Sequence, residues 1–260
     1  MARGAIGVVV PAAGRGERLG GHMAKAFVPL AGRPLVCHTL AAFQRVPQVS
    51  AVVLVARSED QARMQQLVRH ERFTKVRAIV AGGPSRAVSV TRGVAALPAQ
   101  ARWVLVHDAA RPCVTPALIA TIIQDAKRFG AVACGLRSPV TVKAVDEEDR
   151  VRLTLDREGL WLIQTPQAFR RDWFADALTC VNGTLEGFPD DPTTRRIRRR
   201  RICDEGAGLP GGDGWWDDVA ILEWAGFPVR MVPGDPLNIK VTTPEDLLLA
   251  EAILRRTRKA

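Results

Sequence analysis

The sequence contains no tyrosine, and aromatic residues make up only 5% of its 260 residues. Stacking platforms for single-stranded nucleic acid are therefore scarce. No apolar run is long enough to cross a bilayer, so we expect no membrane partner. The N-terminal segment lacks the basic start, long apolar middle and small-residue cleavage site of a signal peptide. We therefore expect a cytoplasmic protein.

Metal-binding cysteine patterns are absent as well. The chain has five cysteines and four histidines. They are scattered, and no Cys-x-x-Cys spacing occurs, so a zinc site is not expected. The residues predicted to be buried free thiols of a reducing compartment are Cys37, Cys113, Cys134, Cys180 and Cys203.

Both common nucleotide-binding loops are missing after the first apolar run, "VVVPAAGRGERLGGHMAKAF" at residues 8–27. Gly14, Gly16 and Gly20 do not give the G-x-G-x-x-G spacing of a Rossmann fingerprint. The run at 51–56 is followed by arginine rather than by the acidic residue that binds ribose. No Walker A motif occurs in the chain.

What the chain does have is an alternation of apolar runs and helical patterns. Short Val-rich runs predict buried strands at 6–10, 51–56, 76–81, 103–107 and 131–136. Helical periodicity lies between them, and Thr115-Pro116 is a typical helix start. We therefore predict a single α/β domain over 1–260 with a doubly wound, mostly parallel sheet.

Two later segments depart from this pattern. Residues 138–160 form two extended stretches around an acidic turn, which predicts either an arm that packs on a partner subunit or a simple surface hairpin. Residues 183–214 are rich in Gly, Pro and charge, which predicts a flexible insert. Its arginine run, Arg195–Arg201, is balanced by nearby acidic residues and is more typical of a solvated loop than of a nucleic-acid arm. The net charge of +10 therefore arises elsewhere and suits an anionic partner.

Small and cationic residues follow the first strand. The small side chains of Ala12, Ala13, Gly14 and Gly16 would let backbone N–H groups approach anionic oxygens. Beyond them, an arginine and a lysine, Arg18 and Lys25, could bind phosphate. The alternative is a tight strand-to-helix turn with solvated cations.

Two further segments also follow predicted strands. Asp108 in "VHDAARP" is a suitable ligand for Mg²⁺, which prefers few carboxylates together with substrate phosphates. Arg111 is placed to bind an anion. In "AGGPSRAVSV", a Gly-Gly turn precedes Arg86 and Ser89 at a predicted helix start. Because ligands bind beyond the carboxyl ends of parallel strands, these segments should converge at one edge.

Four segments, 8–27, 81–90, 106–112 and 238–251, closely resemble the 2-C-methyl-D-erythritol 4-phosphate cytidylyltransferase family in the same order. The resemblance extends from about Ile6 to Leu254. It implies a glycosyltransferase-A-like, Rossmann-like nucleotidyltransferase fold and a homodimer joined by the extended arm. It also implies a Mg²⁺-dependent reaction in which methylerythritol phosphate attacks the α-phosphorus of CTP and pyrophosphate leaves.

The resemblance assigns roles by position. The residues implied to bind the nucleotide are Pro11, Ala12, Ala13, Gly14, Gly16, Gly82, Gly83, Ser89 and Ala109. The catalytic residues implied are Arg18, Lys25 and Lys240, and Asp108 is the implied metal ligand. The implied substrate contacts are Arg111, Thr141, Arg157 and Thr165, of which Thr141 and Arg157 would be donated across the dimer.

Two alternatives remain open. A cytidylyltransferase for another sugar-alcohol phosphate, such as ribitol 5-phosphate, would share the fold and the first loop, although the "NIKVTTPEDL" ending favours methylerythritol phosphate. A basic nucleic-acid-binding protein would instead use Arg195–Arg201, and its binding would depend strongly on salt.

Overall fold

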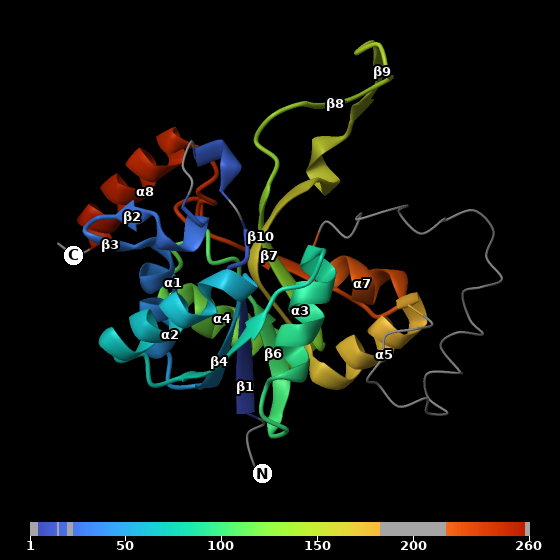
Figure 1. Ribbon diagram of the computed structural model, residues 1–260. Coiled ribbons are helices and arrows are strands. Elements are labelled where there is room, and N and C mark those ends of the chain that lie inside the picture. The colour runs from blue at the N-terminus through green and yellow to red at the C-terminus, as the bar shows by residue number, and fades with distance from the viewer. Residues whose placement is uncertain (1–4, 15, 20–22, 183–216, 258–260) are drawn as a thin grey trace.

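A seven-stranded sheet forms the centre of the protein (Figure 1). The computed structural model describes residues 5–14, 16–19, 23–182 and 217–257. The strand order is β11-β7-β10-β6-β1-β4-β5, and within this sheet only β10 runs antiparallel to its neighbours. The strands are β1 (Ala5–Pro11), β4 (Val49–Ala56), β5 (Val76–Ala81), β6 (Ala101–Val106), β7 (Ala131–Arg137), β10 (Trp161–Arg170) and β11 (Arg230–Pro233).

All five Val-rich runs are strands, so the predicted doubly wound, mostly parallel sheet is confirmed. The sequence does not predict that β10 joins this sheet. This strand inserts between β6 and β7 and runs in the opposite direction. Its early residues therefore lie at the same edge as the carboxyl ends of β1, β5 and β6.

Helices cover both faces of the sheet, which explains why its strands are apolar throughout. Alternate valines of β1 belong to different cores: Val8 and Val10 to one and Val9 to the other, all fully buried. Each such side chain contributes about 1.5–3 kcal/mol by leaving water. The first core includes α1 (Leu35–Gln44), α2 (Gln61–His70) and α4 (Pro116–Phe129); the second includes α3 (Arg86–Ala95), α5 (Arg171–Asn182) and α7 (Val219–Trp224).

Local sequence sets the helix starts. The Thr115 hydroxyl accepts a hydrogen bond from the Leu118 N–H at 3.2 Å, and Pro116 occupies the first turn of α4, as predicted. The last helix, α8 (Pro244–Thr257), packs on the small hairpin of β2 (Pro29–Leu30) and β3 (Arg33–Pro34).

The predicted arm is a separate hairpin of β8 (Val142–Val145) and β9 (Val151–Leu155), which projects from the body in Figure 1. A carboxylate oxygen of Asp146 accepts hydrogen bonds from the N–H groups of Glu148 and Arg150 and so closes the turn. The predicted insert at 183–214, with its arginine run, lies outside the described residues. None of the helices in the described part of the chain is long and apolar enough to cross a membrane.

Candidate functional site

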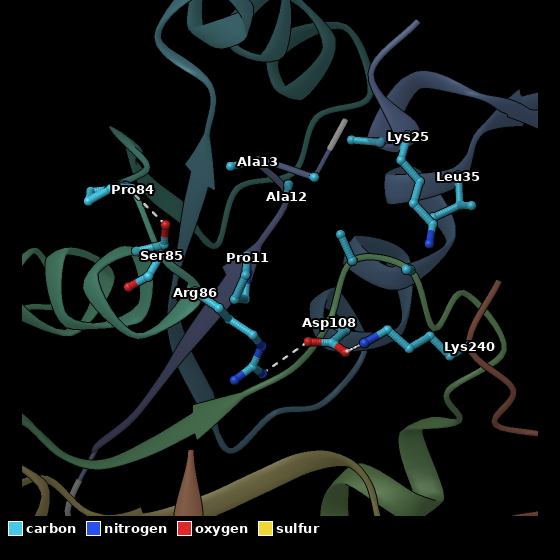
Figure 2. Close-up of a pocket in the computed structure, with 16 residues that line it drawn as sticks. Pro11, Ala12, Ala13, Lys25, Leu35, Pro84, Ser85, Arg86, Asp108 and Lys240 are labelled. Atoms are coloured by element: carbon cyan, nitrogen blue, oxygen red, sulfur yellow. Dashed lines mark hydrogen bonds and ion pairs between the residues drawn. The ribbon is translucent and has the colours of Figure 1, made fainter. Parts of the chain in front are cut away.

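A cavity of about 340 Å³ lies where β1, β5 and β6 end (Figure 2). The segments that follow these strands converge there, as expected for parallel strands. Ten residues with predicted roles line it: Pro11, Ala12, Ala13, Gly14, Lys25, Gly83, Ser89, Asp108, Ala109 and Lys240. Seven others lie around it or away from it: Gly16, Arg18, Gly82, Arg111, Thr141, Arg157 and Thr165.

Lys25 lies in the short 3-10 helix η2 (Lys25–Phe27), and in Figure 2 its side chain points into the cavity. Burial lowers the pKa of Lys25 to about 8, and the positive charges of Lys240 and Arg18 add to the effect. Arg18 is therefore close enough to act on Lys25, although its side chain is exposed and does not line the cavity. The site concentrates positive charge where an anion would bind.

Gly16 supports Lys25 rather than lining the cavity. Its φ is +76°, and a Cβ at this position would lie 3.0 Å from the Lys25 Cβ. A side chain there would be strained and would press on the lysine.

The turn after β5 is held by Ser89. The Ser89 hydroxyl accepts a hydrogen bond from the Gly83 N–H at 2.9 Å. A Cβ on Gly83 would overlap Val88, so the turn packs against α3 at a distance that only glycine permits. The Ser85 hydroxyl caps α3 by accepting from the Val88 N–H at 3.3 Å.

Asp108 lies between two cations. One carboxylate oxygen is 3.1 Å from an Arg86 nitrogen, and the other is 2.7 Å from Nζ of Lys240 (Figure 2). Burial alone would raise the pKa of Asp108, but Arg86 and Lys240 outweigh it and hold this pKa well below its usual range. Asp108 is therefore ionised at neutral pH.

Arg86 also pairs with Asp218: each of its two terminal nitrogens donates to one carboxylate oxygen at 2.8 Å. Arg86 lines the cavity, and neither it nor Asp218 has a role predicted from the sequence. The position of Arg86 at a helix start beside the Gly-Gly turn was a signal for it. No local signal predicts that Asp218 contacts Arg86, because the two residues lie 132 positions apart in the sequence.

Thr165 lies behind Asp108 at the start of the antiparallel strand. Its hydroxyl accepts a hydrogen bond from the Asp108 N–H at 3.1 Å and lies 3.0 Å from Nδ1 of His107. Burial lowers the pKa of His107 to about 4, so the ring is neutral. Because Nε2 of His107 faces the Arg111 carbonyl at 3.2 Å, Nε2 carries the proton and Nδ1 accepts from Thr165.

Arg111 is buried beneath the segment that carries Lys240. Its guanidinium donates to the carbonyls of Asn238 at 2.8 Å and Ile163 at 3.3 Å. Its Nε has no hydrogen-bond partner among the described residues. Burial lowers the pKa of Arg111. The side chain holds the backbone at Asn238, and its predicted contact with methylerythritol phosphate stays a prediction.

Thr141 and Arg157 lie at the base of the arm, where both are exposed. The Arg157 guanidinium donates to the Pro139 carbonyl at 3.4 Å. Neither residue lines the cavity of its own chain. Their predicted role across a dimer stays a prediction.

Within the described residues, no three His, Cys, Asp or Glu side chains form a group that could hold a metal ion. Asp108 is the one carboxylate among the cavity-lining residues that the structure describes. A single ionised carboxylate suits Mg²⁺, because this ion commonly takes one or two protein carboxylates and its other ligands from substrate phosphates and water.

The doubly wound sheet and the cationic cavity at its carboxyl edge define an α/β protein of the nucleotidyltransferase class. A family model, "IspD: 2-C-methyl-D-erythritol 4-phosphate cytidylyltransferase", matches residues 6–194 and 202–256. The enzyme of that name from Desulforamulus reducens is 36% identical over 254 residues, covering 97% of each chain. The Lysinibacillus sphaericus enzyme is 37% identical over 249 residues, covering 96% of this chain and 95% of its own.

Solved structures agree with the sequence comparisons. The crystal structure of 2-C-methyl-D-erythritol 4-phosphate cytidylyltransferase from Thermus thermophilus has a TM-score of 0.68 and 30% identity, covering 96% of this chain and 99% of that one. The chain belongs to the 2-C-methyl-D-erythritol 4-phosphate cytidylyltransferase family.

Proposed function

We propose that the chain transfers a cytidylyl group from CTP to 2-C-methyl-D-erythritol 4-phosphate in isoprenoid precursor biosynthesis. The products are 4-diphosphocytidyl-2-C-methyl-D-erythritol and pyrophosphate. Family membership over nearly the whole chain supports the substrates. The observation that carries the chemistry is that Lys25, Lys240 and Asp108 line one cavity.

CTP would occupy the cavity between the first loop and the turn after β5. The small residues Ala12, Ala13 and Gly14 leave backbone N–H groups accessible to the triphosphate. Gly82, Gly83 and Ser89 would contact cytosine and ribose, and Ala109 the nucleotide beside Asp108. Pro11 and Gly16 complete the phosphate loop, Gly16 through its packing on Lys25.

Catalysis would depend on positioning and on charge. The phosphate of the substrate attacks the α-phosphorus of CTP in line, and pyrophosphate is the leaving group. Lys25 and Arg18 would stabilise the negative charge that develops in the transition state, and Lys240 would hold the attacking phosphate. Lys25 is partly buried and already points into the cavity before the substrates arrive, which reduces the reorganisation that the reaction requires.

Asp108 would hold a Mg²⁺ ion. When bound, the ion neutralises charge on the phosphates of the nucleotide. The ionised state of Asp108 and its position in the cavity wall support this assignment.

A homodimer joined by the arm would complete the substrate site. Large apolar side chains on and beside the arm are exposed although they would gain by burial: Val140, Val145, Val151, Leu153 and Leu162. Docking this arm on a second copy would cover them and bring Thr141 and Arg157 to the partner's cavity. Arg111 and Thr165 would serve the substrate from within the same chain.

Pyrophosphate release tests the proposal directly. The purified chain is mixed with Mg²⁺, CTP and methylerythritol phosphate, with ribitol 5-phosphate and other nucleoside triphosphates in parallel. We expect turnover with CTP and methylerythritol phosphate alone. Turnover with ribitol 5-phosphate instead would support the same cytidylyl transfer but identify a different substrate. No turnover with any pair would refute the proposal. The cytoplasmic location stays a prediction that cell fractionation can test.

A further inference from the structure

Arg86 connects two carboxylates that come from distant parts of the chain. Its terminal nitrogens lie 2.8 Å from the two oxygens of Asp218, and one of them also lies 3.1 Å from Asp108. The Asp218 side chain is 1% exposed and that of Asp108 11% exposed. The Asp218–Arg86–Asp108 unit is therefore a buried chain of charges that reaches the cavity wall.

The geometry of the unit is unequal. Asp218 takes the guanidinium fork with both oxygens, which is the strongest arrangement for an arginine and a carboxylate. Asp108 receives a single N–H at a longer distance. The N–H groups of Asp218 and Val219 both donate to Oε1 of Gln167, at 2.9 and 3.1 Å, and so hold Asp218 in place.

We propose that Asp218 is a positioning residue that keeps Asp108 available to a divalent cation. By holding the fork of Arg86, Asp218 limits that arginine to one contact with Asp108. Without the Asp218 charge, the fork would turn to Asp108, the other carboxylate that Arg86 contacts, and would crowd an oxygen pair that Lys240 already shares. Arg86 would then compete with the cation for the same carboxylate. The inference rests on the proposed function, in which Asp108 holds Mg²⁺ beside CTP.

Asp218→Asn is a suitable test variant. The amide has nearly the shape of the carboxylate, and the backbone contacts to Gln167 do not involve the side chain. Arg86 retains Asp108 as its counter-charge, so no buried charge is left uncompensated. The double variant Arg86→Gln/Asp218→Asn removes the competing guanidinium as well. Asp217→Asn is a matched control, because the adjacent Asp217 accepts hydrogen bonds from the N–H groups of Val219 and Ala220 and, in the part of the chain that the structure describes, does not pair with Arg86.

The measurement is the dissociation constant of CTP with Mg²⁺ and with EDTA, by calorimetry on the full-length protein without the second substrate. The ratio, defined as the constant in EDTA divided by the constant with Mg²⁺, reports the coupling between metal and nucleotide. We expect Asp218→Asn to reduce the ratio by about tenfold, as for other residues that orient a metal ligand. Binding in EDTA should stay within about twofold, since the variant removes no group that lines the cavity. The double variant should restore the ratio, and Asp217→Asn should leave it unchanged.

Each result decides the matter. A reduced ratio that the double variant restores supports the proposal, and a merely structural defect would not be rescued by a second substitution. An unchanged ratio in Asp218→Asn, or an equally low ratio in the double variant, refutes it. If wild-type protein turns over CTP but shows no Mg²⁺ effect on binding, the metal assignment and this proposal fail together while the proposed transfer stands. Absence of turnover by the wild type refutes the proposed function instead.

Discussion

Nζ of Lys240 lies 2.7 Å from the carboxylate oxygen of Asp108 that does not face Arg86. In the protein without substrates, Lys240 therefore forms an ion pair with Asp108 and is not an isolated cation. Its side chain is nevertheless 45% exposed, so it can swing toward an arriving phosphate at little desolvation cost. The pair keeps a positive charge beside the cavity, and this charge adds to the lowering of the Lys25 pKa.

Lys240→Met tests this role. Removing the charge should lower kcat by about 10²–10³-fold, the usual loss for one preorganised donor to a developing charge. The fold should be unaffected because Asp108 keeps Arg86 as a partner. Steady-state kinetics and a thermal melt check both points. Lys127→Met, an exposed change on α4, is the control, and a Lys240→Met enzyme as fast as this control would exclude the predicted role.

Lys25 should make activity depend on pH. Its pKa of about 8 means that the charged form is lost as the pH rises through this value. The kcat/KM for CTP reports the free enzyme and should fall above about pH 8. Lys25→Arg should move this decline to higher pH, because arginine stays charged. A profile that stays flat well above pH 8 in the wild type would contradict the assignment.

The charge of Lys25 should also destabilise the folded protein. The pKa in the folded protein lies below the ordinary 10.5, so folding disfavours the charged form. The destabilisation is fully present below about pH 8 and disappears as the pH rises toward 10.5. Lys25→Met should therefore abolish turnover yet raise the Tm at neutral pH, with a smaller difference near pH 10.5. A lower Tm for Lys25→Met at neutral pH would show that the lysine stabilises the fold.

The sequence predicts the strands well because each buried strand is a short Val-rich run with turns on either side. It does not predict the place of β10. Its pairing with β6 and β7 depends on the chain reversing through the arm, which local pattern does not encode.

The candidate site is predicted where residues end or closely follow a strand, as at Pro11, Gly83 and Asp108. Contacts between distant segments are missed. Asp218 meets Arg86 across 132 residues, and Thr165 meets Asp108 across 57. No spacing in the sequence indicates that the Thr165 hydroxyl accepts a hydrogen bond from the Asp108 N–H. Nor does any spacing indicate that Arg111 donates to carbonyl groups of its own chain.

Leu153→Asp should separate the subunits. Leu153 lies on β9 and is 55% exposed in the single chain, so the charge is tolerated by the monomer but not by an apolar interface. Sedimentation at micromolar concentration should show a dimer for the wild type and a monomer for the variant, with turnover lost. Leu248→Asp, on the exposed face of α8, is the matched control and should stay dimeric. A wild type that sediments as a monomer would overturn the predicted homodimer.

Three glycine variants separate packing from ligand contact. A Cβ on Gly83 would overlap Val88, so Gly83→Ala should lower stability by about 1–3 kcal/mol and weaken CTP binding as the turn shifts. A Cβ on Gly14 meets nothing within 4 Å, yet Gly14 lines the cavity. Gly14→Ala should therefore keep the Tm and raise the KM for CTP by about fivefold or more, the value of one lost hydrogen bond.

Gly159→Ala completes the comparison. Its Cβ also meets nothing within 4 Å, but the residue lies at the base of the arm and away from the cavity. Both the Tm and the KM for CTP should match the wild type. Because Gly14 and Gly159 have equal room for a methyl group, only proximity to the nucleotide distinguishes their expected effects. If Gly14→Ala binds CTP as tightly as Gly159→Ala does, the phosphates do not approach the first loop, and the nucleotide must be placed elsewhere in the cavity.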